Sequence, residues 1–286
     1  MIKCLVSDVD GTLLLHGSFL QVKINDKTIK AIKYLKESGI HFVIATGRTH
    51  ATKEIFEKQF GFPLDFIGSN GASVVVNEKL IVDKTMPWDV FERLTEQVRN
   101  QHIEANILFV DSDGHHIMDK TSGWNDDTFL QMYHSKEIGH YFEGSIHDWR
   151  EHYPRSKKFN KAVVAVKNLS DRDKVAESLK TFVKEENCDM YFSASVFVEI
   201  MPQNVNKASG IKAMSGMLGF QEHEIAVVGD SYNDVFMFEQ YHQHSFVMKS
   251  AEEDVLKKAR YVVSNVDEVI AKVFEINQRE LLDDYR

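Results

Sequence analysis

Two aspartates, separated by one residue, follow the first apolar run of the chain. Residues 2–6 read Ile-Lys-Cys-Leu-Val, which is typical of a buried parallel strand, and Asp8 and Asp10 stand at its carboxyl end before Gly11. Open α/β sheets bind ligands at that edge, and carboxylate oxygens are the ligands that Mg²⁺ prefers. The pair therefore indicates a magnesium and phosphate site, although Asp-x-Asp-Gly on its own is also common in loops.

Three more polar residues occupy comparable places further along the chain. Thr46 and Asp230 each follow a short apolar run, and Lys207 opens a predicted helix. Because the carboxyl ends of parallel strands share one edge of a sheet, we expect these residues to lie close to Asp8. Phosphate-ester chemistry needs a nucleophile, metal ligands and fixed positive donors, and this set offers all three.

The hydrophobic pattern predicts two kinds of structure. Residues 1–83 and 202–286 alternate buried apolar runs with helical spacing, as β-α-β units do, whereas residues 84–201 combine antiparallel strands with two helices. We therefore predict an α/β fold in which a Rossmann-like parallel-sheet core, 1–83 and 202–286, carries an inserted α+β domain, 84–201. Strands are expected at 2–6, 40–45, 66–72, 74–76, 80–82, 107–110, 115–118, 161–166, 190–201, 224–228, 245–248 and 261–263. Helices are expected at 24–38, 49–60, 87–100, 171–186, 208–218, 251–259 and 266–274, with 275–286 as a charged, frayed end.

Composition narrows the class of protein. The 286 residues are 43% hydrophobic and 27% charged, as in an ordinary globular protein, and the net charge of -9 argues against broad nucleic-acid binding. No window approaches the roughly 20 apolar residues of a membrane span. Two cysteines, Cys4 and Cys188, are too few for a disulfide framework, and a core strand directly after Met1 leaves no room for a signal peptide. We expect a cytoplasmic protein, monomeric or a weak homodimer, without nucleic-acid or membrane partners.

Four motifs in a fixed order resemble those of the haloacid dehalogenase (HAD) superfamily, in particular the Cof-type phosphatases of subfamily IIB. They are Asp-Val-Asp-Gly-Thr at 8–12, Thr-Gly-Arg at 46–48, Lys207, and Gly-Asp-Ser-Tyr-Asn-Asp at 229–234. The long interval between the second and third motifs matches an inserted cap of type C2B. Each motif alone is a weak signal, but the ordered set is specific and spans essentially the whole chain.

The resemblance implies a role for each motif residue. Asp8 would be the nucleophile that forms an aspartyl-phosphate, and Asp10 the acid and base that protonates the leaving oxygen and then activates water. The implied Mg²⁺ ligands are Asp8, Asp10 through its carbonyl, Asp230 and, directly or through water, Asp234. The implied phosphoryl contacts are Val9, Thr46, Gly47, Lys207 and Asn233, and the implied substrate-side residues are Arg48 and Asn70.

Several of these residues also have plainer interpretations. Asp234 could cap the next helix, Thr46 could end a strand, Lys207 could be solvated, and Asn70 with Gly71 is a turn signal. The histidines at 115, 116, 134, 140, 147 and 152 lack regular ligand spacing, so we interpret them as polar residues of the cap surface or substrate side. The tryptophans at 88, 124 and 149 are interpreted as core. Residues 248–251 read Met-Lys-Ser-Ala where relatives commonly carry Gly-Asn, a departure on the substrate side.

The expected function is a Mg²⁺-dependent phosphatase acting on a small phosphorylated metabolite. Sugar phosphates are the leading class, with flavin mononucleotide, related biosynthetic intermediates and pyridoxal phosphate as alternatives, because the cap selects the leaving group. Two rival hypotheses are a phosphomutase on the same fold and a non-catalytic metabolite-binding protein with a relic site. A phosphomutase would yield isomerised sugar phosphate without free phosphate, and a binding protein would hydrolyse nothing.

Overall fold

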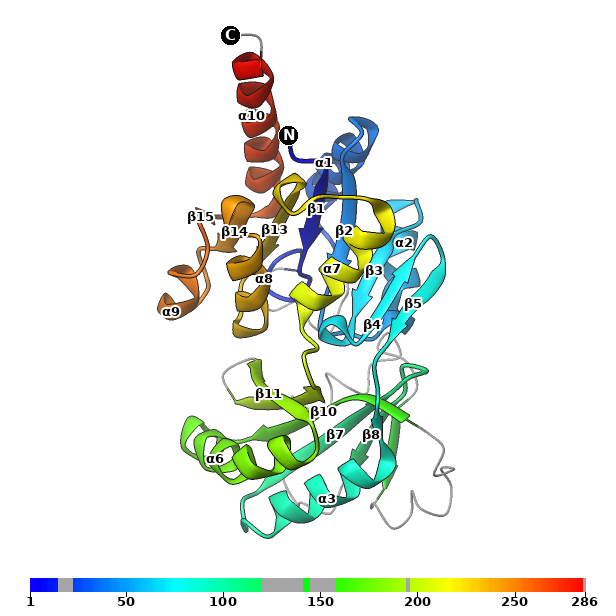
Figure 1. Cartoon of the computed structure of the whole chain (residues 1–286), viewed down its shortest axis with the longest axis vertical. Helices are drawn as coiled ribbons and strands as arrows, with labels where there is room; N and C mark the ends of the chain where they lie inside the picture. Colours follow the sequence, from blue (N-terminus) through cyan, green and yellow to red (C-terminus); the bar gives the residue numbers. More distant parts are fainter. Residues whose placement is uncertain (15–22, 120–140, 145–157, 194–195, 285–286) are drawn as a thin grey trace.

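The structure is a computed structural model that describes residues 1–14, 23–119, 141–144, 158–193 and 196–284. These residues form two sheets, each with its own helices, in two lobes joined by two crossings of the chain (Figure 1). None of the described helices is both long and apolar enough to cross a membrane.

The larger sheet has eight strands, of which the central ones are parallel. Its members are β1 (Cys4–Ser7), β2 (His41–Ala45), β3 (Asp65–Gly68), β4 (Ser73–Val76), β5 (Lys79–Asp83), β13 (Ile225–Gly229), β14 (Ser245–Met248) and β15 (Tyr261–Val263). They lie in the order β15-β14-β13-β1-β2-β3-β4-β5, with antiparallel pairing only at β3-β4 and β4-β5. The predicted parallel core is therefore confirmed, and β1 lies inside it with a parallel neighbour on each side.

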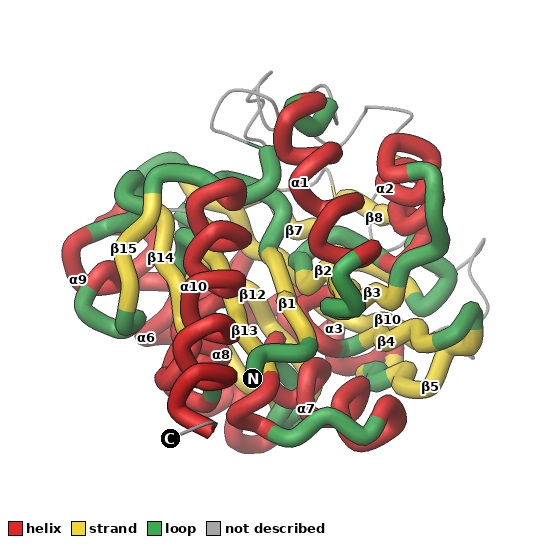
Figure 2. The backbone as a smooth tube through the Cα atoms, turned by 90° about the horizontal axis from the view of Figure 1, so that it is seen from above, coloured by secondary structure: helices red, strands yellow, loops and turns green. Residues whose placement is uncertain are grey.

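Helices cover both faces of this sheet. They are α1 (Asp26–Glu37), α2 (Lys53–Phe60), α7 (Lys207–Leu218), α8 (Val235–Gln240), α9 (Glu253–Leu256) and α10 (Val266–Asp284). α1 and α10 lie over one face of the sheet (Figure 2). The apolar side chains of α1, α2 and α10 pack in one core cluster, and those of α7, α8 and α9 in another, on the opposite face. Asn25 caps α1 as predicted, its side chain accepting the Lys27 backbone N–H at 2.8 Å.

For two helices of the core, the predicted end residues were wrong. α10 continues to Asp284, where a frayed end was expected, because the Asn277 side chain bonds both backbone groups of Ile2 and so ties the helix to the start of β1. The helix expected over 251–259 is limited to Glu253–Leu256. The short helix α8 was not predicted, since its six residues follow directly on the turn after β13.

The second sheet belongs to the insert, defined here as residues 86–202. Its strands are β6 (Met86–Pro87), β7 (Ala105–Asp111), β8 (His116–Asp119), β9 (Tyr141–Gly144), β10 (Lys158–Val166), β11 (Cys188–Ser193) and β12 (Phe197–Pro202). They lie in the order β11-β12-β10-β7-β8-β9, and β6 pairs with β10. Two helices, α3 (Trp88–Arg99) and α6 (Leu169–Glu185), cover the face turned away from the larger sheet (Figure 1). The α+β character of the insert follows the prediction, while the domain limits at 83 and 201 stay a prediction.

One strand prediction for the insert was wrong. Residues 190–201 were expected to form a single strand, but they fold back as β11 and β12, with Tyr191 opposite Glu199. The sequence between Phe192 and Phe197 contains no glycine, proline or asparagine, the residues that signal most turns. Positions 194 and 195 themselves lie outside the described residues.

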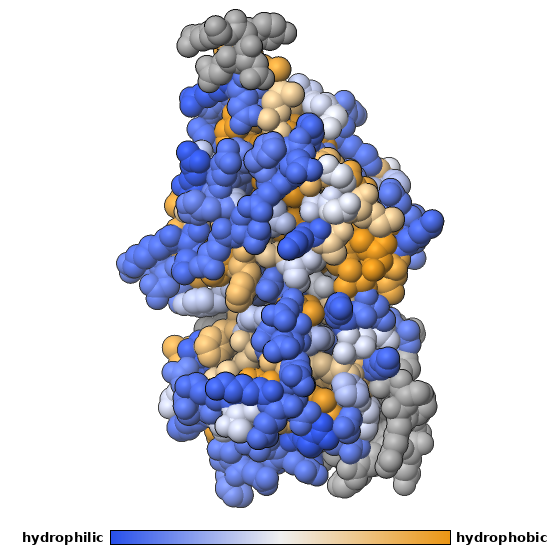
Figure 3. All heavy atoms as spheres, viewed as in Figure 1, coloured by the Kyte–Doolittle hydropathy of each residue, from blue (hydrophilic) through white to orange (hydrophobic). Residues whose placement is uncertain are grey.

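The two faces of the insert sheet differ in chemistry. On the helix side Phe91, Phe109 and Phe159 form an aromatic core, with Trp88 5.2 Å from Phe159 between ring centroids, which confirms Trp88 as core. Trp124 and Trp149 lie outside the described residues. The face toward the larger sheet carries a smaller apolar group, Leu108, Val110, Met118, Val163 and Ala165. Over both lobes, the surface seen in Figure 3 is largely hydrophilic, with an apolar patch at the level of β4 and β5.

A close backbone approach fixes α7 against the loop after β3. Gly71 has a φ of +99°, and a Cβ there would lie 2.2 Å from the carbonyl oxygen of Asn206, the residue that caps α7. Only glycine suits both the positive φ and the contact. This approach places the first turn of α7, and with it Lys207, over the carboxyl edge of the sheet.

We expect Gly71→Ala to lower the free energy of unfolding by about 2 kcal/mol or more, because the added methyl group must displace the start of α7. Gly216→Ala is the matched control: Gly216 lies inside α7 with no atom within 4 Å of an added Cβ, so it should gain up to about 1 kcal/mol. Urea denaturation measures both. Equal effects of the two substitutions would contradict the close contact.

A buried histidine on the insert sheet predicts a pH dependence of stability. Burial, with a smaller effect from the Lys161 ammonium, lowers the pKa of His116 from 6.5 to about 3. Between these values the unfolded chain binds a proton that the native protein does not, so the free energy of unfolding falls as the pH is lowered through this window. The loss approaches about 1.4 kcal/mol per pH unit. His116→Gln should flatten this part of the stability profile from pH 6.5 to 4, whereas substitution of the exposed His223 by Gln should not.

Candidate active site

The predicted site residues meet at the carboxyl edge of the larger sheet. Asp8 directly follows β1, Thr46 follows β2, Asp230 follows β13, and Lys207 is the first residue of α7. All four are buried. Among these four, Lys207 contacts Asp8, and Asp230 lies within 4.8 Å of Asp8, while Thr46 ends the neighbouring strand β2.

Lys207 joins the nucleophile candidate to the fourth motif. Its Nζ lies 2.6 Å from Asp8 Oδ1 and 2.6 Å from Asp234 Oδ1, and the lysine is fully buried. Burial alone would lower the pKa of Lys207, but the two carboxylates outweigh it and raise the pKa above its usual range. The solvated interpretation of Lys207 is therefore wrong, and the lysine is a fixed positive charge inside the site.

Three carboxylates form an acidic cluster around this lysine. One oxygen from each of Asp8, Asp230 and Asp234 lies within 4.8 Å of the others. Burial raises the pKa of Asp8 well above its ordinary value; Lys207 opposes this, and Asp234 and Asp230 add to it. Burial and the charge of Asp234 also raise the pKa of Asp230 to about 7. Three buried carboxylates facing one ammonium lack positive charge, and an all-oxygen donor set of this kind suits a divalent cation such as Mg²⁺.

Asp234 precedes α8 but makes no side-chain capping bond to it, so the interpretation of Asp234 as a cap of that helix was wrong. Its Oδ2 accepts the backbone N–H groups of Asp230 (2.9 Å) and Ser231 (3.0 Å), which closes the turn after β13, while Oδ1 binds Lys207. Both oxygens thus have protein partners. This geometry lets Asp234 hold Asp230 and Lys207 in place.

Asp10 points to a different partner. Arg48 binds it in a bidentate manner, Nε to Oδ2 at 2.9 Å and Nη2 to Oδ1 at 2.6 Å. The sequence had placed Arg48 on the substrate side, and no sequence pattern indicated this ion pair. The arginine therefore orients the side chain that is the candidate acid and base.

The remaining phosphoryl-contact candidates line the same turns. Thr46 Oγ1 accepts the Arg48 backbone N–H at 3.1 Å, Gly47 lies between them, and Val9 is fully buried beside Asp8. Asn233 Nδ2 donates to Asn70 Oδ1 at 3.1 Å. The sequence did not predict a further contact: Thr12, within the first motif, donates its hydroxyl to Asp230 Oδ1 at 3.2 Å.

Asn70 also reaches the insert, which sequence reasoning did not foresee. Its Nδ2 donates to Glu199 Oε2 at 2.5 Å, and the same oxygen accepts Lys161 Nζ at 3.2 Å. The available signal was a charged residue at a buried position in each of two strands, Lys161 in β10 and Glu199 in the otherwise apolar β12. Isolated charges in buried strands are rare unless they are paired or functional.

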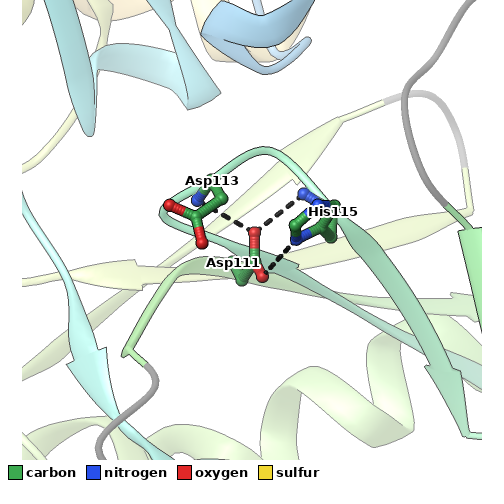
Figure 4. Close-up of side chains that lie close together, drawn as sticks. All are labelled: Asp111, Asp113 and His115. Carbon is green, nitrogen blue, oxygen red and sulfur yellow. Dashed lines mark hydrogen bonds and ion pairs between the residues drawn. The ribbon is translucent and has the colours of Figure 1, made fainter. Parts of the chain in front are cut away.

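A second acidic group lies in the turn between β7 and β8 (Figure 4). Asp111 accepts the backbone N–H groups of Asp113 and His115 and bonds His115 Nδ1 at 2.8 Å. These bonds close a tight turn, so the cluster has a structural explanation. His115 and His116 lie on the insert as expected, and the histidines at 134, 140, 147 and 152 lie outside the described residues.

A family profile described as haloacid dehalogenase-like hydrolase matches residues 5–274. The chain belongs to this family. Proteins similar to this haloacid dehalogenase-like hydrolase include a 5-amino-6-(5-phospho-D-ribitylamino)uracil phosphatase of Bacillus subtilis, 23% identical over 273 residues that cover 95% of this chain and 94% of that protein.

Solved structures agree with this haloacid dehalogenase-like fold. A HAD subclass IIB sugar phosphatase superimposes with a TM-score of 0.73 at 21% identity, covering 96% of this chain and 99% of that one. A protein of Streptococcus mutans superimposes with a TM-score of 0.79 at 18% identity, covering 96% and 100%. At these identities the structures establish a shared fold, and the family membership establishes a hydrolase.

We expect Mg²⁺ to raise the melting temperature of the metal-free protein, because a cation that binds only the native cluster stabilises it, by about 2.7 kcal/mol at 100 times Kd. Asp230→Asn should abolish this shift in differential scanning fluorimetry. Asp113→Asn, in the turn of the insert, should retain it. The reverse pattern would place the cation at the turn between β7 and β8.

Proposed function

We propose that this chain is a Mg²⁺-dependent phosphatase that hydrolyses a small phosphorylated metabolite through an aspartyl-phosphate. The observation that carries the proposal is the fully buried Lys207, held 2.6 Å from both Asp8 and Asp234 beside a third carboxylate at the carboxyl edge of the sheet. This arrangement supplies a nucleophile, a cation site and a fixed positive charge in one place.

The two steps use the two aspartates of the first motif. Asp8 Oδ attacks phosphorus, the bond from phosphorus to the leaving oxygen breaks, and Asp10 gives that oxygen its proton. Asp10 then takes a proton from the water that attacks the aspartyl-phosphate, which releases inorganic phosphate and restores Asp8. Arg48 orients Asp10 for both transfers. Mg²⁺, held by Asp8, Asp230 and the Asp10 carbonyl with support from Asp234, would neutralise the charge of the phosphoryl group.

The surrounding turns bind the phosphoryl oxygens. The proposed contacts are Val9, Thr46, Gly47, Lys207 and Asn233. We assign the cap domain to residues 84–201 and the core domain to residues 1–83 and 202–286, and the cap contacts the leaving group. A sugar phosphate is the leading substrate class, supported by the likeness to a HAD subclass IIB sugar phosphatase, with flavin mononucleotide, related biosynthetic intermediates and pyridoxal phosphate as alternatives.

We expect Asp8→Asn to reduce Mg²⁺-dependent phosphate release from p-nitrophenyl phosphate by about 10⁴-fold or more, because the amide is not a nucleophile. Chelation of the metal should remove the wild-type activity as well. Asp173→Asn, an exposed position on α6, serves as the control and should leave turnover unchanged.

Three results would count against the proposal. Wild-type-like turnover by Asp8→Asn would exclude the covalent mechanism. Conversion of one sugar phosphate into an isomer without free phosphate would indicate a phosphomutase. Tight binding of one metabolite with no hydrolysis across sugar phosphates, nucleotides, flavin mononucleotide and pyridoxal phosphate would indicate a binding protein.

A further inference from the structure

A buried pair of opposite charges faces the candidate active site from the insert. Lys161 and Glu199 lie on neighbouring strands, and their side chains are only 8% and 6% exposed. In the strand register Glu199 stands opposite Val163, and Lys161 stands opposite Val110. Paired residues share a face of a sheet, so both charges lie on the face that is turned toward the larger sheet. The buried His116, which stands opposite Val110, lies on the same face.

This pair is not explained by the stability of the insert. Removing two charges from water costs several kcal/mol per ion, and apolar residues of the same size often serve equally well. The neighbours Val110, Val163 and Ala165 are apolar and would accommodate such a replacement. A charged pair at this position therefore indicates a ligand that interacts with it.

Three donors bind the Glu199 carboxylate, whereas the Lys161 ammonium donates to one acceptor among the described residues. Glu199 accepts from Asn70 Nδ2, from Lys161 Nζ and from the Ser193 hydroxyl, so both of its oxygens are occupied. An ammonium has three N–H donors, and among the described residues Lys161 is bonded only to Glu199. The carboxylate thus fixes the lysine and leaves it donors for another acceptor.

The position of Lys161 shows where that acceptor would lie. A Cβ built on Gly47 would be 3.6 Å from Lys161 Nζ and 3.3 Å from Asn70 Oδ1. Gly47 belongs to the turn that we propose to bind the phosphoryl group. Lys161 is therefore an insert residue whose donors reach the space beside the turn proposed to bind the phosphate, where the first atoms of the leaving group would lie.

We propose that Lys161, oriented by Glu199, is a specificity-determining residue that donates a hydrogen bond to a hydroxyl group of the leaving group close to the phosphate ester. This inference rests on the proposed phosphatase function and deepens it. Lys161 and Glu199 together carry no net charge, so the pair offers a directed donor without attracting a second anionic group. The apolar residues around it suit the C–H surfaces of the same ligand. The chemistry fits a neutral polyol or sugar esterified to phosphate, rather than a second phosphate or a carboxylate.

The test compares two substrates that differ only in hydroxyl groups. Glycerol 3-phosphate and n-propyl phosphate have leaving groups of the same length, and p-nitrophenyl phosphate reports the intact phosphoryl chemistry. The wild type should favour glycerol 3-phosphate over n-propyl phosphate by about 10-fold or more in kcat/KM, the effect of a hydrogen bond to a charged donor. Lys161→Met should remove this preference by lowering kcat/KM for glycerol 3-phosphate alone, with n-propyl phosphate within about twofold of wild type.

Control variants distinguish a role of Lys161 in substrate recognition from a role in folding. Lys158→Met, at the exposed start of the same strand β10, should keep the wild-type preference. If Lys161→Met does not fold, the double variant Lys161→Met with Glu199→Gln removes both buried charges together and takes its place in the same assay. Thermal unfolding confirms that each variant is folded.

The substrate preferences of the variants support or overturn the inference as follows. Loss of preference in Lys161→Met with retained preference in Lys158→Met supports the inference. An equal loss of kcat/KM on both substrates in Lys161→Met would assign Lys161 a structural role. Equal kcat/KM values of the wild type on both substrates would exclude recognition of the hydroxyl group. Either result overturns the inference. Failure of the wild type to hydrolyse p-nitrophenyl phosphate as well would instead overturn the proposed function.

Discussion

The site depends on one buried cation. Lys207 is enclosed without solvent contact, and its ammonium binds one carboxylate from the strand-end turn of β1 and one from the turn after β13. An isolated charge at this depth would be strongly unfavourable, so the lysine can occupy the position only while both aspartates are in place. The converse also holds, because the carboxylates would repel one another without it. Fold and chemistry are therefore joined through a single side chain.

Most of the core could be predicted because its elements are local in sequence. Each parallel strand is a short apolar run that ends in a polar residue, and this pattern alone placed Asp8, Thr46 and Asp230 at one edge of the sheet. The order of the motifs then assigned different expected roles to otherwise similar aspartates. Residues that act where their own strand or helix ends are the ones that sequence reasoning can locate.

Contacts between elements far apart in the chain escaped prediction. The pairing of Arg48 with Asp10 depends on the relative depth of two strand-end turns, which no spacing encodes. The contact of Glu199 with Asn70 depends on how the insert rests on the core, and the continued helix near Asn277 depends on a bond to the other end of the chain. In each case the sequence shows the polar residue but not its partner.

The position of β1 within the sheet also determines how the site responds to thermal opening. β1 is hydrogen-bonded on one side to β13 and on the other to β2, whereas β15 and β5 lie at the edges. Edge strands can detach singly, but a strand bonded on both sides is released only when the sheet itself comes apart. The amides of β1 should consequently be among the slowest to exchange with solvent deuterium. The strand that leads to Asp8 would persist through local fluctuations, so that the candidate site stays assembled until the protein unfolds globally.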